Sequence, residues 1–500
     1  MSGFFFSVSL TFSDSNFLNF KEQRITMKNQ ITGKHLIKIG YKESAALGKA
    51  IVIANTAFKG QSKPEILRLL KKLRNYPENF LDDEILGELA KSFVEEATTP
   101  KNAFISLNEN APNYNIYGAQ HIEPGALSQM DIAMKLPVTI AGALMPDAHQ
   151  GYGLPIGGVL ATKNAIIPYG VGVDIGCRMA LSVYDIPVDY FFANEAKFKR
   201  EISANTKFGA GKSFEGKSKS DHEVLERKEF NMIPFIKKMH GKAWEQLGTS
   251  GGGNHFVEFG ILEFDKKDEA LGIEKGSYVA LLTHSSSRGF GATIAGHYTK
   301  IAKEMTRLPK EAINLAYLDM NSQQGQEYWM AMNLAGDYAS ACHEVIHDKI
   351  SKSVGGKLLA KIENHHNFAW KEMFNGEELI VHRKGATPAG KDVMGIIPGS
   401  MTAPGFLVRG KGEKDSINSA SHGAGRQMSR TQAIKTISSD EMRKVLKDHG
   451  VSLMGAGRDE APMAYKDINA VMASQKELVD VVAKFTPKIV RMADDGSRED

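Results

Sequence analysis

The chain has 500 residues, of which 42% are hydrophobic and 24% charged, and its formal net charge is only +4. This composition is typical of a globular protein with ample apolar material for a core. The small net charge excludes a general electrostatic attraction to nucleic acid, so any site for a polyanion must be local. No stretch approaches the roughly 20 uninterrupted apolar residues of a membrane-spanning helix, and we expect no membrane partner.

Residues 1–26 begin with an apolar stretch that lacks a basic region and a small-residue cleavage site, so we predict a disordered extension and not a signal peptide. Residues 27–115 are predicted to form an N-terminal helical and loop region. Within it, KPEILRLLKKLRNYPENFLDDEILGELAKSFVEEA indicates two amphipathic helices separated by a turn that contains proline.

From residue 116 the pattern changes to short apolar runs separated by glycine, which indicate buried strands joined by functional loops. Residues 186–247 interrupt this pattern with a lysine-rich helical insertion. Because no internal repeat or linker is found, we predict an α+β fold: one large domain over residues 116–492, with mixed β-sheets surrounded by helices, and a tail over 493–500.

The chain contains two cysteines, Cys177 and Cys342. Two cysteines cannot form a disulfide framework, which fits a reducing compartment, and we expect a cytoplasmic protein. Cys342 lies in the helical pattern LAGDYASACHEVIHDKI and is predicted to be a small buried apolar residue. Cys177 lies in GVGVDIGCRM, three residues after Asp174, where glycines frame the loop and metal or thiolate chemistry stays open.

Two glycine-rich segments resemble known nucleotide-binding motifs. GAGKS at residues 209–213 lacks the glycine that a P-loop requires five residues before its Gly-Lys pair, because Thr206 stands there. GVGVDIG fails as a dinucleotide fingerprint because its third glycine is misplaced. We therefore reject both motifs.

Four of the 15 histidines stand beside small or polar residues that let the backbone approach a ligand: His255, His284, His366 and His422. With Asp174 and Cys177 they offer oxygen, sulfur and nitrogen ligands, which suit zinc, manganese or iron, and a thiolate can bridge two cations. Six other histidines are predicted to be ordinary surface residues: His222, His240, His343, His347, His382 and His449. No short ligand spacing such as CxxC is present, so the sequence does not establish that the ligands converge.

Two further loops, PGSM at 398–401 and HGAGR at 422–426, could hold phosphate oxygens with their backbone amides. Arg288, Arg426 and Arg430 follow the candidate loops, and guanidinium groups there could bind phosphate in a bidentate manner.

Taken in order from about 117 to 475, the motifs resemble those of the RNA-splicing ligase RtcB family. They read MPDAHQGYGLPIGGVLAT, YGVGVDIGCRM, GGGNHFVEFG, HSSSRGFG, HHNFAWKE, RKGATPAG, IIPGSM, SHGAGRQMSR and DEAPMAYKDINAVM. Each motif is weak evidence alone, whereas the ordered set is very specific.

The resemblance implies an RNA ligase that joins ends with a 3′-phosphate or 2′,3′-cyclic phosphate to 5′-hydroxyl ends, in RNA repair or tRNA splicing. It implies GTP, two Mn²⁺ ions and, in many members, the activator archease. By motif, one ion would bind Asp174, Cys177 and His255, and the other Cys177, His284 and His366. His422 would be the nucleophile that becomes guanylylated.

The same resemblance implies a set of nucleotide-lining residues and three arginines that meet RNA or triphosphate. The nucleotide set is Asn254, His255, Phe256, Val257, Glu258, His366, Asn367, Pro398, Gly399, Ser400, Met401, Gly423, Ala424, Gly425 and Arg491; the arginines are Arg288, Arg426 and Arg430.

The chain also departs from the family pattern. Gly405 stands about where many members have a serine that contacts guanine, and Arg491 stands where the family has a terminal lysine. Two alternatives stay open: a metal-dependent phosphoesterase, because the same ligands could activate water, and an RNA-binding paralogue with weakened catalysis, which these departures suggest.

Overall fold

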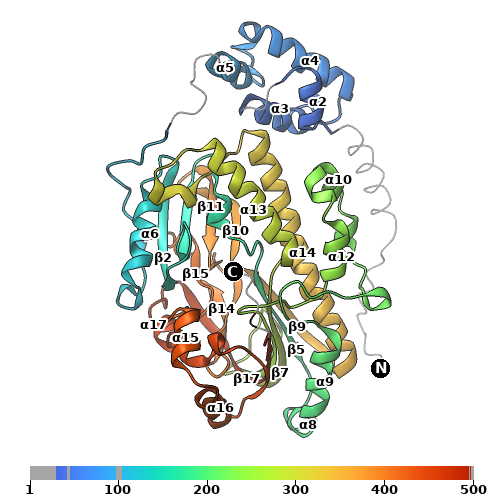
Figure 1. Cartoon of the computed structure of the whole chain (residues 1–500), viewed down its shortest axis with the longest axis vertical. Coiled ribbons are helices and arrows are strands. Elements are labelled where there is room, and N and C mark those ends of the chain that lie inside the picture. Colours follow the sequence, from blue (N-terminus) through green and yellow to red (C-terminus); the bar gives the residue numbers. More distant parts are fainter. Residues whose placement is uncertain (1–29, 42–44, 97–103, 495, 497–500) are drawn as a thin grey trace, which may run out of the picture. The chain divides into compact units, whose positions relative to one another are not determined.

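The computed structural model describes residues 30–41, 45–96, 104–494 and 496. The predicted extension over 1–26 and most of the predicted tail lie outside the described residues. The chain divides into two compact units, one of Met1–Lys101 with Asp319–Gln326 and one of Asn102–Leu318 with Glu327–Asp500. Helices and several sheets occur together, which confirms the predicted α+β class (Figure 1).

The first unit is helical. Its elements are α2 (Gly33–Lys38), α3 (Ala45–Thr56), α4 (Lys63–Asn75), the 3₁₀ helix η1 (Pro77–Phe80) and α5 (Gly87–Glu96). Ser62 and Glu65 form a capping box that begins α4, and the helix buries Ile66, Leu70 and Leu73 along one face. These side chains join a cluster with Leu36 and other residues of the unit, so an amphipathic pattern builds the small core.

The second unit contains a five-stranded sheet. Its order is β1 (Asn115–Ile116), β2 (Thr139–His149), β3 (Ile156–Thr162), β11 (Glu377–Lys384) and β10 (Asn367–Phe374). Ala143 and Met145 of β2 pack with α17 (Ile468–Ala473), whereas Leu144 packs with α6 (Pro124–Met134). The alternation follows from the two-residue period of a strand, and it covers both faces.

An eight-stranded sheet forms the other half of this unit. Its order is β13 (Met394–Ile397), β14 (Gly405–Gly410), β17 (Val479–Met492), β6 (Phe256–Phe264), β7 (Gly276–Ser285), β5 (Arg178–Tyr184) and β9 (Leu358–His365), with β16 (Ser452–Gly455) paired to β17. Val257 and Leu281 face a cluster that includes Ile346 of α14 (Gln323–Val354), while Leu282 faces the opposite cluster. Helices α8 (Val188–Ala193) and α9 (Glu195–Asn205) complete the cover of the first face.

The remaining elements are short or lie outside the two large sheets. They are η2 (Ala119–His121), β4 (Ala165–Ile166), α7 (Pro168–Val171), η3 (Gly216–Ser218), η4 (Glu223–Glu226), α10 (Glu229–Met232), α11 (Pro234–Lys237), α12 (His240–Gln246), α13 (Arg288–Met305), η5 (Lys310–Leu315), β8 (Leu318–Asp319), β12 (Ala386–Pro388), β15 (Ser419–Ser421), α15 (Arg430–Thr436), α16 (Ser439–Asp448), η6 (Arg458–Glu460) and η7 (Pro462–Ala464). None of the described helices is long and apolar enough to cross a membrane.

The two large sheets meet in sequence at a single residue. Strand β9 ends at His365 and β10 begins at Asn367, so the chain passes from the eight-stranded to the five-stranded sheet at His366. His366 is buried, and its backbone N–H donates to the carbonyl of Cys177. A predicted metal ligand therefore lies at the junction of the two sheets.

Candidate metal centre and nucleotide pocket

Sheet topology explains why residues distant in sequence meet at one place. Strand β5 is antiparallel to both β7 and β9, and Arg178 at its start lies opposite Ser285 and His365 at their ends. Strand β6 is antiparallel to β7, and Phe256 at its start lies opposite His284. The loops before β5 and β6 and the ends of β7 and β9 therefore share one edge of the sheet.

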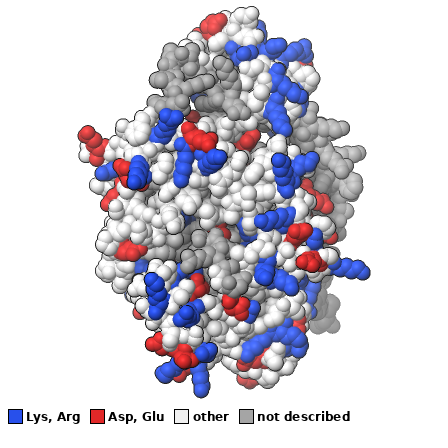
Figure 2. Space-filling model, viewed as in Figure 1, with Lys and Arg blue, Asp and Glu red and all other residues white. Residues whose placement is uncertain are grey.

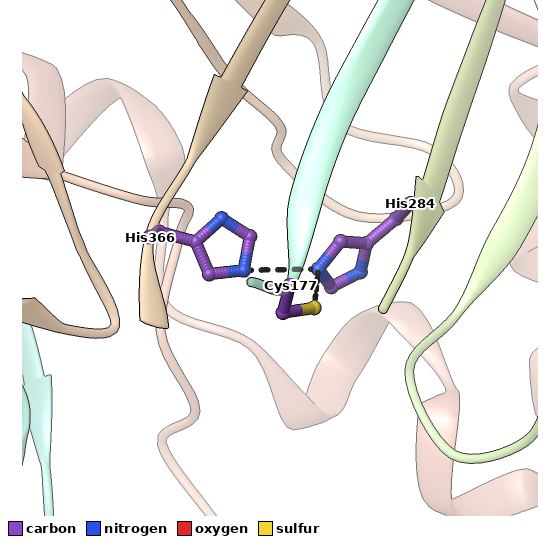
Figure 3. A group of neighbouring side chains, drawn as sticks. All are labelled: Cys177, His284 and His366. Atoms are coloured by element: carbon purple, nitrogen blue, oxygen red, sulfur yellow. Dashed lines mark hydrogen bonds between the residues drawn. The ribbon is translucent and has the colours of Figure 1, made fainter. Parts of the chain in front are cut away.

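Cys177, His284 and His366 form the first group of possible metal ligands at this edge (Figure 3). The sulfur of Cys177 lies 3.2 Å from Nε2 of His284, and Nε2 of His284 lies 3.2 Å from Nε2 of His366. All three residues are buried.

Asp174 and His255 complete a second group with the same cysteine. Nε2 of His255 lies 3.3 Å from the sulfur of Cys177 and 3.4 Å from Oδ2 of Asp174. Within each group the ligand atoms lie within 4.8 Å of one another. The structure thus brings together all five residues predicted as metal ligands, in two sets that share Cys177.

Glycines make the turn that carries Asp174 and Cys177. Gly172 has φ 99° and Gly176 has φ 69°, in the region that favours glycine. A Cβ atom on Gly176 would lie 2.8 Å from the Cα of Gly336 in α14. The N–H of Gly176 donates to the carbonyl of Asn367 at 2.8 Å, so the turn is fixed against two neighbouring segments.

Burial and neighbouring charges set the protonation of these ligands. Burial would raise the pKa of Asp174, but His255, Arg288 and hydrogen bonds lower it to about 2. Burial would lower the pKa of His255, but Cys177 and Asp174 raise it to about 9. Burial lowers the pKa of His284 well below its usual value, so this imidazole is neutral and has a lone pair available.

Hydrogen bonds to neighbouring residues hold the ligand side chains in place. Nδ1–H of His284 donates to the carbonyl of Asn254 at 3.1 Å, which leaves Nε2 unprotonated and directed at the cluster. The hydroxyl of Ser286 donates to Oδ1 of Asp174 at 2.8 Å. Burial lowers the pKa of His366 well below its usual value, so its imidazole is also neutral. The donor set and its supports suit a cation that accepts sulfur, nitrogen and oxygen.

Arg288 differs from its predicted placement in contact with substrate. Its side chain is buried, does not line the pocket, and donates from Nη1 to the carbonyl of Ser250 at 2.6 Å; Nη1 also lies 3.1 Å from Nδ1 of His255. The residue begins α13 with φ 56°. The contacts support positioning of a ligand side chain, not contact with phosphate.

His422 lies beside the metal-ligand groups, with its ring centroid 4.9 Å from that of His366. Its Nδ1 lies 2.6 Å from Oδ2 of Asp147, a fully buried carboxylate on β2. Burial would raise the pKa of Asp147, but His422 lowers it, so the carboxylate is charged and accepts Nδ1–H. Nε2 of His422 is then the ring atom with a free lone pair.

Sequence reasoning misses Asp147 as a site residue. It lies in MPDAHQ, a motif used for the family resemblance, but one aspartate beside proline and alanine carries no spacing signal of its own. A Cβ on Gly425 would lie 2.1 Å from the carbonyl oxygen of Asp147, so the HGAGR loop needs glycine at that point. The loop and the carboxylate are fitted to each other.

A pocket opens beside His422 and both ligand groups. From the predicted set, the following residues line it: Asp174, Cys177, Asn254, Phe256, Glu258, His284, His366, Asn367, Pro398, Gly399, Ser400, Met401, His422, Gly423, Ala424, Gly425, Arg426 and Arg430. His149, Lys384, Glu460 and Tyr465 also line it and were not predicted.

Three residues of the predicted nucleotide set do not line the pocket: His255, Val257 and Arg491. Val257 packs in the cluster under α14, because alternate side chains of β6 point to opposite faces and only Phe256 and Glu258 face the pocket. Arg491 does not line the pocket; its Nη1 donates to the carbonyl of Met454 at 2.6 Å, and its guanidinium lies over the ring of Phe208.

Arg426 and Arg430 line the pocket as parts of an ionic network. Nη1 of Arg430 pairs with Oδ2 of Asp459 at 3.0 Å and also contacts Glu460. Arg426 donates to the carbonyl of Asp459 at 2.6 Å and lies over the ring of Tyr465 at 5.2 Å. The acidic partners Asp459 and Glu460 hold both guanidinium groups in fixed orientations and offset their charge locally.

The prediction of ordinary surface residues is wrong for His343, His347 and His382, which are buried. His343 and His347 lie one helical turn apart on α14 and face Thr283 of β7, at 2.6 Å and 2.8 Å. His382 lies in β11, where its Nε2 accepts the N–H of Ile167 at 2.9 Å. Cys342, in contrast, is buried as predicted.

Three features lie together at this place in the fold. A buried sulfur, nitrogen and oxygen ligand set lies beside an imidazole that a carboxylate orients, and a pocket with two anchored arginines adjoins both. Such a combination could serve a group-transfer enzyme that uses a metal ion.

Comparison with known proteins identifies the family. The family model described as tRNA-splicing ligase RtcB matches residues 129–234 and 231–493. The RNA-splicing ligase RtcB of Escherichia coli (strain K12) is 34% identical over 416 residues, covering 76% of this chain and 97% of that protein. The tRNA-splicing ligase RtcB of Nanoarchaeum equitans is 31% identical, covering 69% of this chain and 87% of that protein. The chain belongs to the RtcB family.

Proposed function

We propose that this chain is an RNA ligase that joins 3′-phosphate ends to 5′-hydroxyl ends through a guanylylated His422. The observation that carries the proposal is the contact of Nδ1 of His422 with Oδ2 of Asp147, beside two ligand groups that share Cys177. Family membership supports the reaction class. The sparse use of cysteine supports action in the cytoplasm.

His422 performs the first step. Its Nε2 attacks the α-phosphate of GTP, a phosphorus–nitrogen bond forms, and pyrophosphate leaves as the bond to the β-phosphate oxygen breaks. The ring becomes positively charged, and the buried carboxylate of Asp147 stabilises that charge while it holds Nδ1–H. Asp147 therefore orients the nucleophile and favours the covalent intermediate.

The later steps transfer GMP to RNA and then release it. An oxygen of the RNA 3′-phosphate attacks the guanylyl phosphorus and frees His422, which leaves the RNA end activated by GMP. The 5′-hydroxyl of the second RNA end then attacks the 3′-phosphate, and GMP departs as the phosphodiester forms. A 2′,3′-cyclic phosphate must first be hydrolysed to the 3′-phosphate.

Asp174, Cys177 and His255 would hold one manganese ion, and Cys177, His284 and His366 the other. Such ions would supply positive charge beside the reacting phosphates and increase the acidity of a bound hydroxyl. Arg426 and Arg430 are fixed at the pocket, where they would meet triphosphate or RNA. We expect the strictness of guanine selection to differ from relatives, because Gly405 offers no side chain at the pocket.

The test is incubation with α-labelled GTP and Mn²⁺, followed by denaturing electrophoresis. We expect label on the wild type and on His449→Ala, a control at an exposed histidine, and no label on His422→Ala. A ligation assay with 3′-phosphate and 5′-hydroxyl RNA then follows. Phosphate release that survives His422→Ala would indicate the phosphoesterase instead, and RNA binding without label in any divalent metal would indicate the non-catalytic paralogue.

A further inference from the structure

Tyr152 presents an exposed aromatic ring close to the pocket. Its side chain is 67% exposed, among the highest values of the described large hydrophobic residues. It lies in the loop between β2 and β3, the strands that carry His149 and Ile156 to the pocket. The mechanism above uses neither this ring nor its loop.

The loop of Tyr152 is held firmly. Nε2 of Gln129 donates to the carbonyl of Gly151 at 2.6 Å, and the N–H of Gly151 donates back to Oε1 of Gln129 at 3.0 Å. Gly153 has φ +72°, and a Cβ there would lie 2.7 Å from the carbonyl oxygen of Asn314. The ring is thus presented on an ordered loop, which lowers the entropic cost of binding a partner.

A second aromatic ring and two lysines lie beside Tyr152. The ring of Tyr169 lies 6.2 Å from that of Tyr152, at an interplanar angle of 48°. Nζ of Lys384 donates to the carbonyl of Tyr152 at 2.5 Å and lies 5.2 Å from the ring centroid of Tyr169. Nζ of Lys303 lies 5.9 Å from the same centroid and donates to Oδ1 of Asn314 at 2.8 Å.

Lys384 joins this aromatic pair to the active-site pocket, because it also lines the pocket. The exposed ring and the second ring offer a stacking surface like that of platforms for single-stranded nucleic acid. Lys303, which is half-buried, supplies a positive charge beside the rings. Lys384 instead supports the loop: it is buried, donates to the carbonyls of Tyr152 and Tyr169, and burial lowers its pKa to about 7. The molecule as a whole is not strongly basic, since the net charge is only +4. Figure 2 shows Lys and Arg interspersed with Asp and Glu over the face in view, so the two rings and the lysines would act as a local site.

We propose that Tyr152, supported by Tyr169, Lys303 and Lys384, stacks on the base of a nucleotide at an RNA end that enters the pocket. The proposal rests on the proposed function, since RNA ends are the substrates of that ligase. A stacking contact does not distinguish among bases, so it suits an enzyme that joins ends of varied sequence. It would place the end without taking part in the chemistry.

The test compares Tyr152→Ala with Tyr152→Phe, which keeps the ring. Tyr190→Ala is the matched control, because Tyr190 is 43% exposed and has Lys197 at 5.7 Å from its ring. Base stacking by aromatic side chains is worth about 1–3 kcal/mol, so we expect Tyr152→Ala to raise the KM for RNA by roughly 5- to 150-fold. Guanylylation by GTP should be unchanged in all three variants, and Tyr152→Phe and Tyr190→Ala should keep the wild-type KM.

A second measurement uses RNA with 2-aminopurine at the 3′-terminal or at the 5′-terminal nucleotide. The wild-type protein should quench the 2-aminopurine fluorescence at one of the two positions, and Tyr152→Ala should remove that quenching. The position that responds identifies the RNA end that stacks. The proposal is overturned if neither position is quenched, if Tyr152→Ala keeps the wild-type KM, or if Tyr152→Phe is as impaired as Tyr152→Ala. If the wild-type protein takes no label from GTP, the proposed function is contradicted instead. Quenching that depends on Tyr152 would still show that this ring stacks on RNA.

Discussion

Oδ2 of Asp147 accepts three hydrogen bonds at the His422 loop: from Nδ1 at 2.6 Å, from the N–H of His422 at 3.2 Å and from the N–H of Gly423 at 3.3 Å. One buried oxygen therefore fixes the ring, the tautomer and the backbone of the proposed nucleophile together. The side chain of Asp147 is fully buried, whereas that of His422 is 16% exposed toward the pocket.

Asp147→Asn tests this relationship. The amide keeps the volume of the carboxylate but loses its charge, so the ring tautomer is no longer enforced and its developing positive charge is no longer stabilised. We expect the rate of guanylylation to fall by roughly 10²- to 10⁴-fold, as when the carboxylate of a catalytic triad is replaced. The rate is measured with α-labelled GTP in single turnover. Asp448→Asn on the exposed end of α16 is the control, and an unchanged rate in Asp147→Asn would show that the carboxylate only supports the fold.

Cys177→Ala tests the shared thiolate. Both ligand groups contain this sulfur, so its loss should weaken the binding of both ions. The loss of affinity should exceed the roughly 10- to 100-fold that is typical when a residue hydrogen-bonded to a ligand is removed. Isothermal titration with Mn²⁺ measures the affinity and the number of ions. Cys342→Ala removes the other buried cysteine and should retain both sites. Two ions bound with wild-type affinity in Cys177→Ala would exclude a bridging thiolate.

Gly176→Ala tests the turn that carries the ligands. The variant combines a left-handed backbone with a close approach to Gly336, so the turn must shift. We expect a loss of about 1–3 kcal/mol in the free energy of unfolding and weaker Mn²⁺ binding. Gly211→Ala is the control, because Gly211 has φ +72° and an added Cβ there would meet no heavy atom within 4 Å, so it reports the backbone cost alone. Equal losses in the two variants would show that the contact with Gly336 has no effect.

Glu363→Gln tests a partly buried ion pair next to the cluster. Glu363 contacts Arg178 and accepts a hydrogen bond from the hydroxyl of Ser340 at 2.8 Å. Nη2 of Arg178 donates to the carbonyl of Gly336 at 2.6 Å. Burial would raise the pKa of Glu363, but Arg178 and Ser340 lower it. A lowered folded-state pKa stabilises the fold above the unfolded value of about 4.3, and this stabilisation is lost as pH falls through the folded value.

At pH 7 we therefore expect Glu363→Gln to lose about 1–3 kcal/mol of unfolding free energy relative to wild type. The difference should shrink below about pH 4, as the wild-type carboxylate gains its proton. Urea unfolding at several pH values measures it. Glu377→Gln breaks the exposed pair with Lys163 and should change little at any pH. A loss that is independent of pH would rule out the charge of Glu363 as its cause.

The sequence predicted the α+β class and many of the residues that gather at the pocket, but spacing alone could not establish their convergence. Asp174 and His366 are far apart in the chain, and they meet because β5 is antiparallel to both β7 and β9. That pairing order is a property of the whole sheet, which no local pattern encodes. The ordered family motifs supplied the information that hydrophobic periodicity lacked.

The errors also have physical causes. The alternation in β6 places Val257 under α14, and the motif resemblance overlooks that period of two. His343 and His347 are polar residues on α14, and their ring nitrogens meet Thr283, Ser182 and the carbonyl of Ser285 in the facing sheet. Pairing between a helix and a sheet cannot be read from the helix alone, so the helical pattern wrongly predicts a surface position for both histidines.

The position of His366 between the two sheets has a consequence for the order of folding. Its backbone joins β9 to β10, while its fellow ligands depend on β5, β6 and β7. A complete ligand set therefore requires most of the long-range strand pairings to be in place, and these are the slow contacts in folding. We expect Mn²⁺ to stabilise the finished protein by mass action and to leave the refolding rate unchanged, in contrast to small domains that fold around a metal.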